Sequence, residues 1–422
     1  MKKSLKSLLL SLLLVINSLG TQNINISIQD DCCSRSDESD LASQLDSISF
    51  AVENISSALD SMGTCPVTLL YNVPGGQTLT KSGRYCLAED ILVTGTVGII
   101  IDGSGITLDL NGHSIILTGS SGEIGIAIAT DPLLTTTFAD IRIKNGTVIN
   151  SNPPVYVSPP PMTIPVFSNI GISAGSGDNV VYDLCIEDVT CVALDAGISL
   201  NHTIDAVVDR VKCDLGNVGL FGTNQVSLLV QNSLFNNNVT AGFAVVKFSG
   251  SSGNSSKVIH CGASNNGIVG FVVVSAADFL FQDCFAAENQ QSGFIIVLSN
   301  AISLVNCLAQ SQDNSTDLEA NGFLVTVSTD IVFRECSAIN NKSVGFNDNN
   351  PANQYYSNYA CGNGTNYSSS VVSAPVTSPA NARGVYNVDC SNSAVDEVAL
   401  LESTCEVLNS KLDFIISYLI AP

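Results

Sequence analysis

Residues 242–246 read GFAVV, and the second half of the chain repeats this motif as GFVVV (270–274), GFIIV (293–297), GFLVT (322–326) and GFNDN (345–349). The Gly-Phe pairs lie 28, 23, 29 and 23 residues apart. Internal repeats of about 20 to 50 residues indicate a solenoid, in which each repeat packs only on its neighbours. The apolar runs between the motifs are short, rich in β-branched and aromatic residues and bounded by Asn, Asp, Ser and Gly, without helical periodicity. The repeat therefore predicts an all-β solenoid.

Three short strands per repeat, joined by polar corners, predict a parallel β-helix. In such a stack each strand pairs with its copy in the next rung, about 4.8 Å away, so equivalent side chains lie on top of one another. The repeat phenylalanines then form one internal ladder: Phe243, Phe271, Phe294, Phe323 and Phe346. The residues two positions further on share that face: Val245, Val273, Ile296 and Val325. Asp348 breaks this second ladder, so we expect the stack to end near it.

The chain contains 14 cysteines, and six of them recur with the repeat: Cys191, Cys213, Cys261, Cys284, Cys307 and Cys336. Their spacing predicts one column of small apolar side chains in a narrow corner of the core, a role that suits free cysteine. Disulfides between neighbouring rungs are the alternative, but in-register parallel strands aim both thiols the same way, which opposes the required dihedral angle. Cys65 with Cys86 and Cys361 with Cys390 lie outside the repeat and are better disulfide candidates.

Asparagines recur four or five residues after three of these cysteines, at Asn265, Asn289 and Asn340. Asparagine tolerates the left-handed conformation of a corner and can bond to its stacked copy, so we interpret these residues as structural, with ligand contact as the alternative. His113 ends an Asn-Gly turn and could join Asp109 in a catalytic triad. A hydrogen bond at a corner is the simpler interpretation.

Residues 1–20 combine a basic start, an apolar run and small residues before a cleavage point after Gly20. This pattern predicts a secretory signal peptide and therefore an exported protein, whether secreted, on the cell surface or in the periplasm. No later run is apolar enough for a membrane span. Three of the 16 Lys and Arg lie in the signal peptide, so its removal changes the net charge from −22 to −25. Such an acidic chain repels phosphate backbones, which argues against nucleic acid as a partner.

Heptad patterns flank the repeat on both sides. Apolar residues alternate spacings of four and three from Leu41 to Met62 and again from Ala394 to Leu419. These segments predict either coiled coils that assemble a homo-oligomer such as a trimer, or single amphipathic helices that cover the open ends of the stack. The predicted organisation is a signal peptide at 1–20, a linker at 21–40, a helix at 41–62, a cap at 65–90, a stack of about ten or eleven rungs at 91–350, a loop or stalk at 351–393 and a helix at 394–419.

Three stretches of the repeat carry a family resemblance: GITLDLNGHSIILTG (105–119), ADIRIKNGTVINS (139–151) and DFLFQDCFAAENQQSGFIIV (278–297). They resemble the right-handed parallel β-helix superfamily, which has the pectate-lyase-like fold. The resemblance implies that fold and no particular activity, because the superfamily includes lyases, hydrolases, epimerases, phage tailspikes and adhesins.

The catalytic motifs of the superfamily are incomplete in this chain. Polygalacturonase-like hydrolases carry Asn-Thr-Asp, Asp-Asp, Gly-His-Gly and Arg-Ile-Lys in that order, and of these only Arg142-Ile143-Lys144 occurs within the repeat. We interpret it as a strand with two outward charges. The carboxylate cluster and basic residue of pectate lyases would require a column of Asp with Arg at rung spacing, and the sequence predicts no such column.

Two insertions interrupt the repeat. One contains Asp313, Asp317 and Glu319, which could hold Ca²⁺ through side-chain oxygens. A solvated acidic loop is the simpler interpretation, so no cofactor is expected. The other, 152–165, is rich in proline, which prevents strand pairing, and is interpreted as an exposed loop, with partner binding as the alternative.

The complete repeat, the heptads and the incomplete catalytic motifs favour a non-enzymatic exported scaffold that binds a glycan or a surface protein. A polysaccharide lyase or glycoside hydrolase with a diverged site is the first alternative, and a structural component of a cell envelope is the second. The sequence assigns no catalytic residue.

Overall fold

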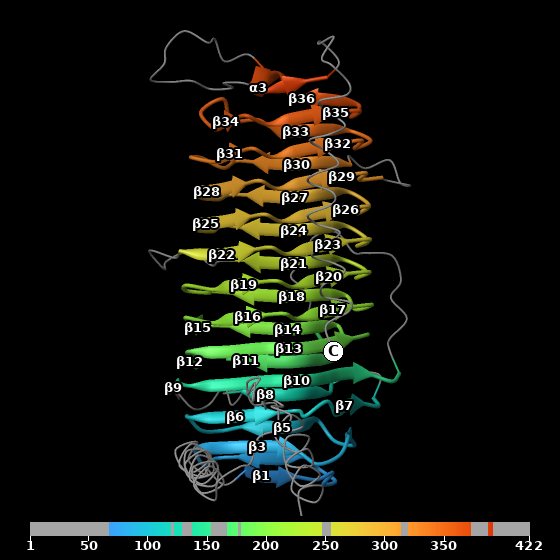
Figure 1. Cartoon of the computed structure of the whole chain (residues 1–422), viewed down its shortest axis with the longest axis vertical. Helices are drawn as coiled ribbons and strands as arrows, with labels where there is room; N and C mark the ends of the chain where they lie inside the picture. Colours follow the sequence, from blue (N-terminus) through green and yellow to red (C-terminus); the bar gives the residue numbers. More distant parts are fainter. Residues whose placement is uncertain are drawn as a thin grey trace, which may run out of the picture. The chain divides into compact units, whose positions relative to one another are not determined.

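The computed structural model describes residues 67–119, 122–128, 137–152, 167–175, 179–246, 255–313, 320–372 and 387–390. The predicted signal peptide, linker and heptad helices, at 1–20, 21–40, 41–62 and 394–419, lie outside these residues. Within them the chain winds as a stack of short strands in which neighbouring rungs pair in parallel (Figure 1). The predicted parallel β-helix is therefore confirmed.

Each turn of the chain passes through three strand columns. Column 1 contains β1 (Val67–Leu70), β3 (Gly83–Leu87), β6 (Ile106–Asp109), the first halves of β10 (Ile141–Asn150) and β13 (Leu184–Val192), β16 (Val207–Asp209), β19 (Leu229–Gln231), β22 (Ser256–Ile259), β25 (Ala277–Gln282), β28 (Asn300–Val305), β31 (Val332–Arg334) and β34 (Gln354–Tyr356). Column 2 contains β4 (Ile91–Val93), β7 (Ser114–Leu117), the second halves of β10 and β13, β17 (Lys212–Asp214), β20 (Leu234–Asn236), β23 (Gly262–Ser264), β26 (Phe285–Ala287), β29 (Leu308–Gln310), β32 (Ser337–Ile339), β35 (Tyr359–Cys361) and β37 (Val388–Asp389). Together the two columns form a sheet of 22 strands.

Column 3 is a separate sheet that closes each turn. It contains β2 (Gln77–Leu79), β5 (Val97–Ile101), β8 (Ile124–Ile128), β11 (Ile170–Ala174), β14 (Ala196–Asn201), β18 (Val218–Thr223), β21 (Ala241–Val246), β24 (Val269–Val274), β27 (Ser292–Val297), β30 (Asn321–Thr326), β33 (Val344–Asp348) and β36 (Thr365–Tyr367). A third sheet of three short strands, β9 (Thr137–Phe138), β12 (Val180–Tyr182) and β15 (Thr203–Ile204), lies between columns 3 and 1 in sequence, and α3 (Ser369–Val372) follows β36.

The stack is longer than the sequence predicts. The 12 strands of column 3 exceed the predicted ten or eleven rungs. Residues 67–87, predicted as part of a cap, supply strands of the first turns, because β1 pairs with β3 and β3 pairs with β6. Residues 354–367, predicted as loop or stalk, add a further turn through β34, β35 and β36.

The predicted phenylalanine ladder is present in column 3. Phe243, Phe271, Phe294, Phe323 and Phe346 are successive register partners. From Phe271 to Phe346 the rings are nearly parallel, with centroids 4.8 to 5.0 Å apart. The second ladder, Val245, Val273, Ile296 and Val325, also forms, and Asp348 follows it. The repeat therefore sets the register through its inward side chains.

Asp348 does not end the stack as predicted. Its carboxylate is buried, yet it accepts hydrogen bonds from Tyr355 Oη at 2.7 Å and from Asn353 Nδ2 at 2.8 Å. These partners lie in the next turn, so the turn that follows Asp348 supplies the hydrogen bonds that its buried carboxylate needs. Tyr367 continues the ring ladder on Phe346 at 5.2 Å.

The six repeat cysteines are buried and free, which confirms the packing interpretation over disulfides between rungs. They form two columns and not one, which corrects the prediction. Cys191 pairs in register with Cys213, whose next partner is Phe235. The remaining four lie one residue before the column 2 strands that begin at Gly262, Phe285, Leu308 and Ser337. Cys191 and Cys213 precede a column 3 glycine by six residues, whereas Cys261, Cys284 and Cys336 precede theirs by nine, so the two spacings mark two positions in the turn.

One predicted disulfide forms. Cys361 and Cys390 are bridged, with their Cα atoms 5.2 Å apart, and fix β37 to β35 at the end of column 2. Of the second predicted pair, Cys86 carries a free thiol, and Cys65 lies outside the described residues.

Polar side chains also form internal ladders. The amide oxygen of Asn266 accepts from the backbone N–H of Asn238, and Asn289 serves Asn266 in the same way. Asn265 and Asn340 instead occupy corners with φ of 56° and 54°. The structural interpretation of the asparagines is confirmed. They lie in two adjacent columns, with Asn265 and Asn340 in the corner column and Asn289 in the amide ladder.

The buried thiols predict an alkaline instability. Burial raises the pKa of Cys261 to about 12 and holds the pKa of Cys284 and Cys336 well above its ordinary value. Unfolded thiols release their protons near their ordinary pKa of about 9, whereas the folded ones keep them, so stability should fall as pH rises from about 9 toward 12. Cys284→Ala should make the unfolding midpoint less sensitive to pH across this window, as followed by circular dichroism. An unchanged pH slope in this variant would contradict the prediction.

Candidate functional site

The bend between columns 1 and 2 directs a row of polar side chains outward. At this corner successive rungs place Asn145, Asp188, Arg210 and Asn232 at φ values between 50° and 59°. The residue before each corner also points outward, since it alternates with a buried neighbour in column 1. In register order these residues are Lys144, Glu187, Asp209 and Gln231, and Asp109 pairs with Lys144 from the preceding rung.

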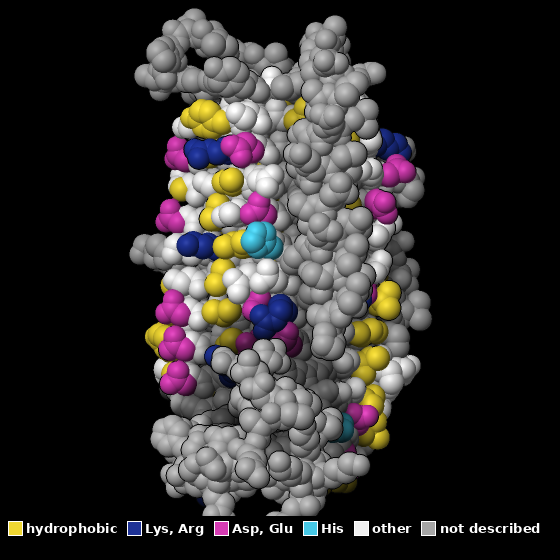
Figure 2. All heavy atoms as spheres, viewed as in Figure 1, with side chains coloured by type: hydrophobic (Ala, Val, Ile, Leu, Met, Phe, Trp, Pro, Cys, Tyr) yellow, Lys and Arg dark blue, Asp and Glu magenta, His cyan; other side chains and the backbone are white. Residues whose placement is uncertain are grey.

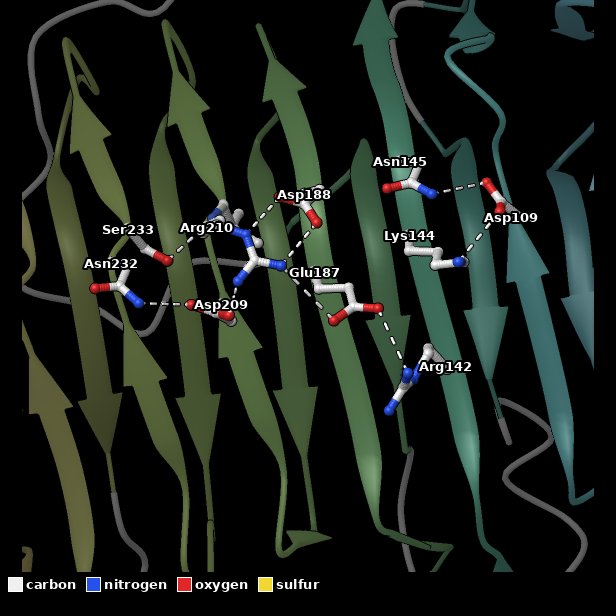
Figure 3. A network of polar contacts seen from close by, with 11 residues as sticks. Asp109, Arg142, Lys144, Asn145, Glu187, Asp188, Asp209, Arg210, Asn232 and Ser233 are labelled. Atoms are coloured by element: carbon white, nitrogen blue, oxygen red, sulfur yellow. Dashed lines mark hydrogen bonds and ion pairs between the residues drawn. The ribbon is translucent and has the colours of Figure 1, made fainter. Parts of the chain in front are cut away.

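Arg210 is the centre of the resulting charge network (Figure 3). Its guanidinium donates from Nε to Asp188 Oδ1 at 2.6 Å and from Nη2 to Asp188 Oδ2 at 2.8 Å. It also donates from Nη1 to Asp209, and Glu187 Oε2 lies 3.8 Å from Nη2. Paired, charge-assisted hydrogen bonds of this kind are strong and directional. The bond to Asp188 raises the pKa of Arg210, so this cation stays charged.

The network continues across neighbouring rungs. Arg142 Nη1 lies 3.7 Å from Glu187 Oε1, and Lys144 Nζ lies 3.3 Å from Asp109 Oδ2. Asn232 Nδ2 donates to Asp209 Oδ1 at 2.9 Å. We call this set of seven charged residues the charged corner: Asp109, Arg142, Lys144, Glu187, Asp188, Asp209 and Arg210. Every carboxylate in it contacts a cation or amide of an adjacent rung.

The charged corner corrects one prediction and confirms another. The sequence predicted no column of Asp with Arg at rung spacing, yet Asp188 and Arg210 occupy the same corner position in neighbouring rungs, beside the column of Asp109, Lys144, Glu187 and Asp209. It was missed because Asp109, Lys144, Glu187 and Asp209 are 35, 43 and 22 residues apart, so insertions hide the period. The interpretation of Arg142 and Lys144 as outward charges around the buried Ile143 is confirmed.

The other candidates from the sequence lie apart. His113 Nδ1 is 3.4 Å from Asp90 and not beside Asp109, which bonds Lys144 and Asn145 instead. Asp313 lies 3.5 Å from Lys342 Nζ, while Asp317 and Glu319 fall outside the described residues. Among the residues that the structure describes, no three His, Cys, Asp or Glu are placed to hold a metal ion. The described part of the chain also contains no helix long and apolar enough to cross a membrane.

An apolar row accompanies the charged corner. Val207, Leu229, Leu280 and Val332 are half-buried residues on the outer face of column 1, in the row that includes Arg142. Figure 2 shows hydrophobic, acidic and basic side chains interspersed on one face of the stack. Such a surface offers bidentate hydrogen bonds from arginine beside aliphatic contact area, which suits carboxylate- or hydroxyl-bearing ligands.

Comparisons with known proteins add likenesses of fold. No protein-family model and no curated protein matches the sequence. The periplasmic alginate epimerase AlgG is similar in structure, with 13% identity, a TM-score of 0.43 and coverage of 68% of this chain and 74% of that one. The A-module of the Azotobacter vinelandii mannuronan C-5 epimerase AlgE4 has 12% identity and a TM-score of 0.41, and the match covers 69% of this chain and 88% of that one. Pectate lyase Pel9A has 18% identity and a TM-score of 0.29, and the match covers 59% of this chain and 63% of that one. At these identities and scores the likenesses carry no argument about activity.

Proposed function

We propose that the protein is exported and acts as a non-enzymatic scaffold that binds a glycan or a surface protein through the charged corner. The supporting observation is that each of the four carboxylates there faces a cation of the protein itself. Asp188 and Asp209 accept hydrogen bonds from Arg210, Glu187 faces two arginines, and Asp109 faces Lys144. A general acid or base needs an oxygen within reach of a substrate proton, whereas these oxygens are engaged by the protein itself.

Arg142 is the cation best placed to meet a partner. Its side chain is 54% exposed, and its one ion pair among the described residues is the 3.7 Å contact with Glu187. The guanidinium can therefore donate to a carboxylate or hydroxyl of a ligand while β10 holds its backbone rigidly. Because the backbone of β10 is already ordered, the ordering cost on binding is confined to the Arg142 side chain.

Arg142→Ala is expected to weaken binding at least tenfold, because a hydrogen bond to a charged group contributes about 1.5–3 kcal/mol. Binding would be measured with the mature chain on an array of neutral and uronate-containing oligosaccharides and on immobilised surface proteins. Arg334→Ala is the matched control, since Arg334 is an exposed arginine on the outer face of the same column in β31. Equal binding by both variants and the unaltered protein would overturn the assignment of the charged corner.

An enzyme acting on polysaccharides is the second candidate, and one observation favours it. Glu187 and Asp209 are register partners on adjacent strands, and Arg210 contacts both. Retaining glycosidases place two carboxyl groups about 5 to 5.5 Å apart, close to the distance between rungs. Turnover of any oligosaccharide on the array, abolished by Asp209→Asn, would establish this candidate and replace the scaffold proposal.

A further inference from the structure

The outer face of column 2 carries a second apolar row, distinct from the charged corner. Leu234, Gly262, Phe285 and Leu308 are successive register partners in β20, β23, β26 and β29. Each is followed by a residue that faces the core, such as Ala286 after Phe285. Because side chains alternate along a strand, the row faces away from the core. We call these four residues the outer row.

The two leucines of the outer row are buried although they lie outside the core, and Phe285 is half-buried. Leu234 and Leu308 are each 6% exposed, and neither belongs to the apolar clusters of the interior. A Cβ atom on Gly262 would lie 2.3 Å from Phe285 Cζ and 2.8 Å from Leu234 Cδ2, so these two side chains converge over the glycine. Other outward apolar residues, such as Val327 at 64% and Leu298 at 57%, remain open to solvent. The burial therefore calls for an apolar surface that packs on the row.

The chain leaves the described residues at the end of this same column. Val388 pairs with Tyr359 and Asp389 with Ala360, so β37 lies on β35, and the Cys361–Cys390 bridge fixes it there. The outer row begins two rungs below β35, at β29, and ends five rungs below it, at β20. A segment that follows Cys390 therefore starts at the end of the same column, three rungs from β29.

The length of the C-terminal segment fits this path. Residues 394–419 place Ala394, Val398, Leu401, Cys405, Leu408, Leu412, Ile415 and Leu419 on one helical face. At about 1.5 Å per residue a helix of this length spans about 39 Å, or about eight rungs at 4.8 Å each. That reach covers the whole outer row from an anchor at β35.

We propose that residues 394–419 form an amphipathic helix that lies along the outer row of the same chain and runs back down the stack. Its apolar face packs on Leu234, Phe285 and Leu308. Four of its five acidic residues, Asp396, Glu402, Glu406 and Asp413, lie on the other side of the helix and face solvent, while Glu397 lies at the edge of the apolar face. The helix is thus neither a strand of a coiled-coil trimer nor a cap on the open end. The helix covers the outer row along the side of the stack and so prevents this apolar surface from binding a second copy of the protein.

Hydrogen exchange on the full-length mature chain tests this arrangement. We expect slow exchange in 394–419 at every protein concentration, together with a monomeric mass by light scattering. The double variant Leu234→Asn, Leu308→Asn should exchange at least tenfold faster in 394–419, while the column 3 strands that carry the phenylalanine ladder stay protected. The matched control is Leu215→Asn, Leu298→Asn, which changes two leucines that are each 57% exposed and should leave the segment protected.

Three results would overturn the proposal. Residues 394–419 could exchange as fast as an unstructured peptide in the unaltered chain. Their protection could survive the Leu234 and Leu308 substitutions. It could also disappear on dilution together with a trimeric mass, which would assign the segment to a coiled coil between copies.

Discussion

Replacing Phe294 with alanine is expected to lower the free energy of unfolding by about 3–5 kcal/mol. The ring lies between Phe271 at 4.9 Å and Phe323 at 5.0 Å, nearly parallel to both, and is 1% exposed. Removing it leaves a cavity lined by rings that are held by their own rungs and so cannot close it. The strand register prevents collapse, because each neighbouring ring is fixed to its own backbone. Denaturant unfolding followed by circular dichroism measures the loss.

Leu298→Ala is the control for Phe294→Ala. Leu298 directly follows the same strand but is 57% exposed, so its truncation should change stability by no more than about 0.5 kcal/mol. Similar losses in the two variants would show that the ring ladder contributes nothing beyond ordinary side-chain area.

The double substitution Cys361→Ser, Cys390→Ser is expected to destabilise the final turn by about 3–4 kcal/mol. The bridge closes a loop with a sequence separation of 29 residues, and the chain entropy released by opening a loop of that size corresponds to about this energy. A solenoid is stabilised rung by rung, so the loss should be local. Hydrogen exchange should accelerate in β35 and β36 and remain unchanged in β5 and β8.

Cys86→Ser is the matched control for the disulfide, since Cys86 has a free, half-buried thiol in β3. A reducing agent should reproduce the effect in the unaltered chain and have no further effect on the double variant. Uniform acceleration across all strands would contradict the local character of the bridge.

The inward-facing half of the structure was predictable from the sequence, and the outward-facing half was not. Phe271, Phe294 and Phe323 recur because each must fill the space above its copy, so the sequence pattern records the stacking directly. Residues on the outer face have no such constraint. The charged corner could not be predicted from the sequence for that reason, and insertions of different length also interrupt its period.

Two further predictions about the interior were wrong, each for its own physical reason. The sequence predicts that the stack ends near Asp348, because an acid is costly inside a core, but Tyr355 and Asn353 of the next turn supply its hydrogen bonds. The sequence predicted one cysteine column because two different positions of the turn each carry cysteines a few residues before a column 3 glycine. Only the register shows that Cys213 pairs with Phe235 and that the other cysteines lie elsewhere in the turn.

The phenylalanine ladder has a consequence for how such a molecule can change in length. Residues 270–292 begin at one Gly-Phe motif and end just before the next, so removing them would bring Phe243 directly beneath Phe294. The new neighbours would match as well as the old ones did, because both contacts join like to like. A gene that duplicates or loses such a unit therefore shifts the two ends of the protein by about 4.8 Å without a new packing problem. Each Gly-Phe unit can therefore be added or removed as one rung of the stack.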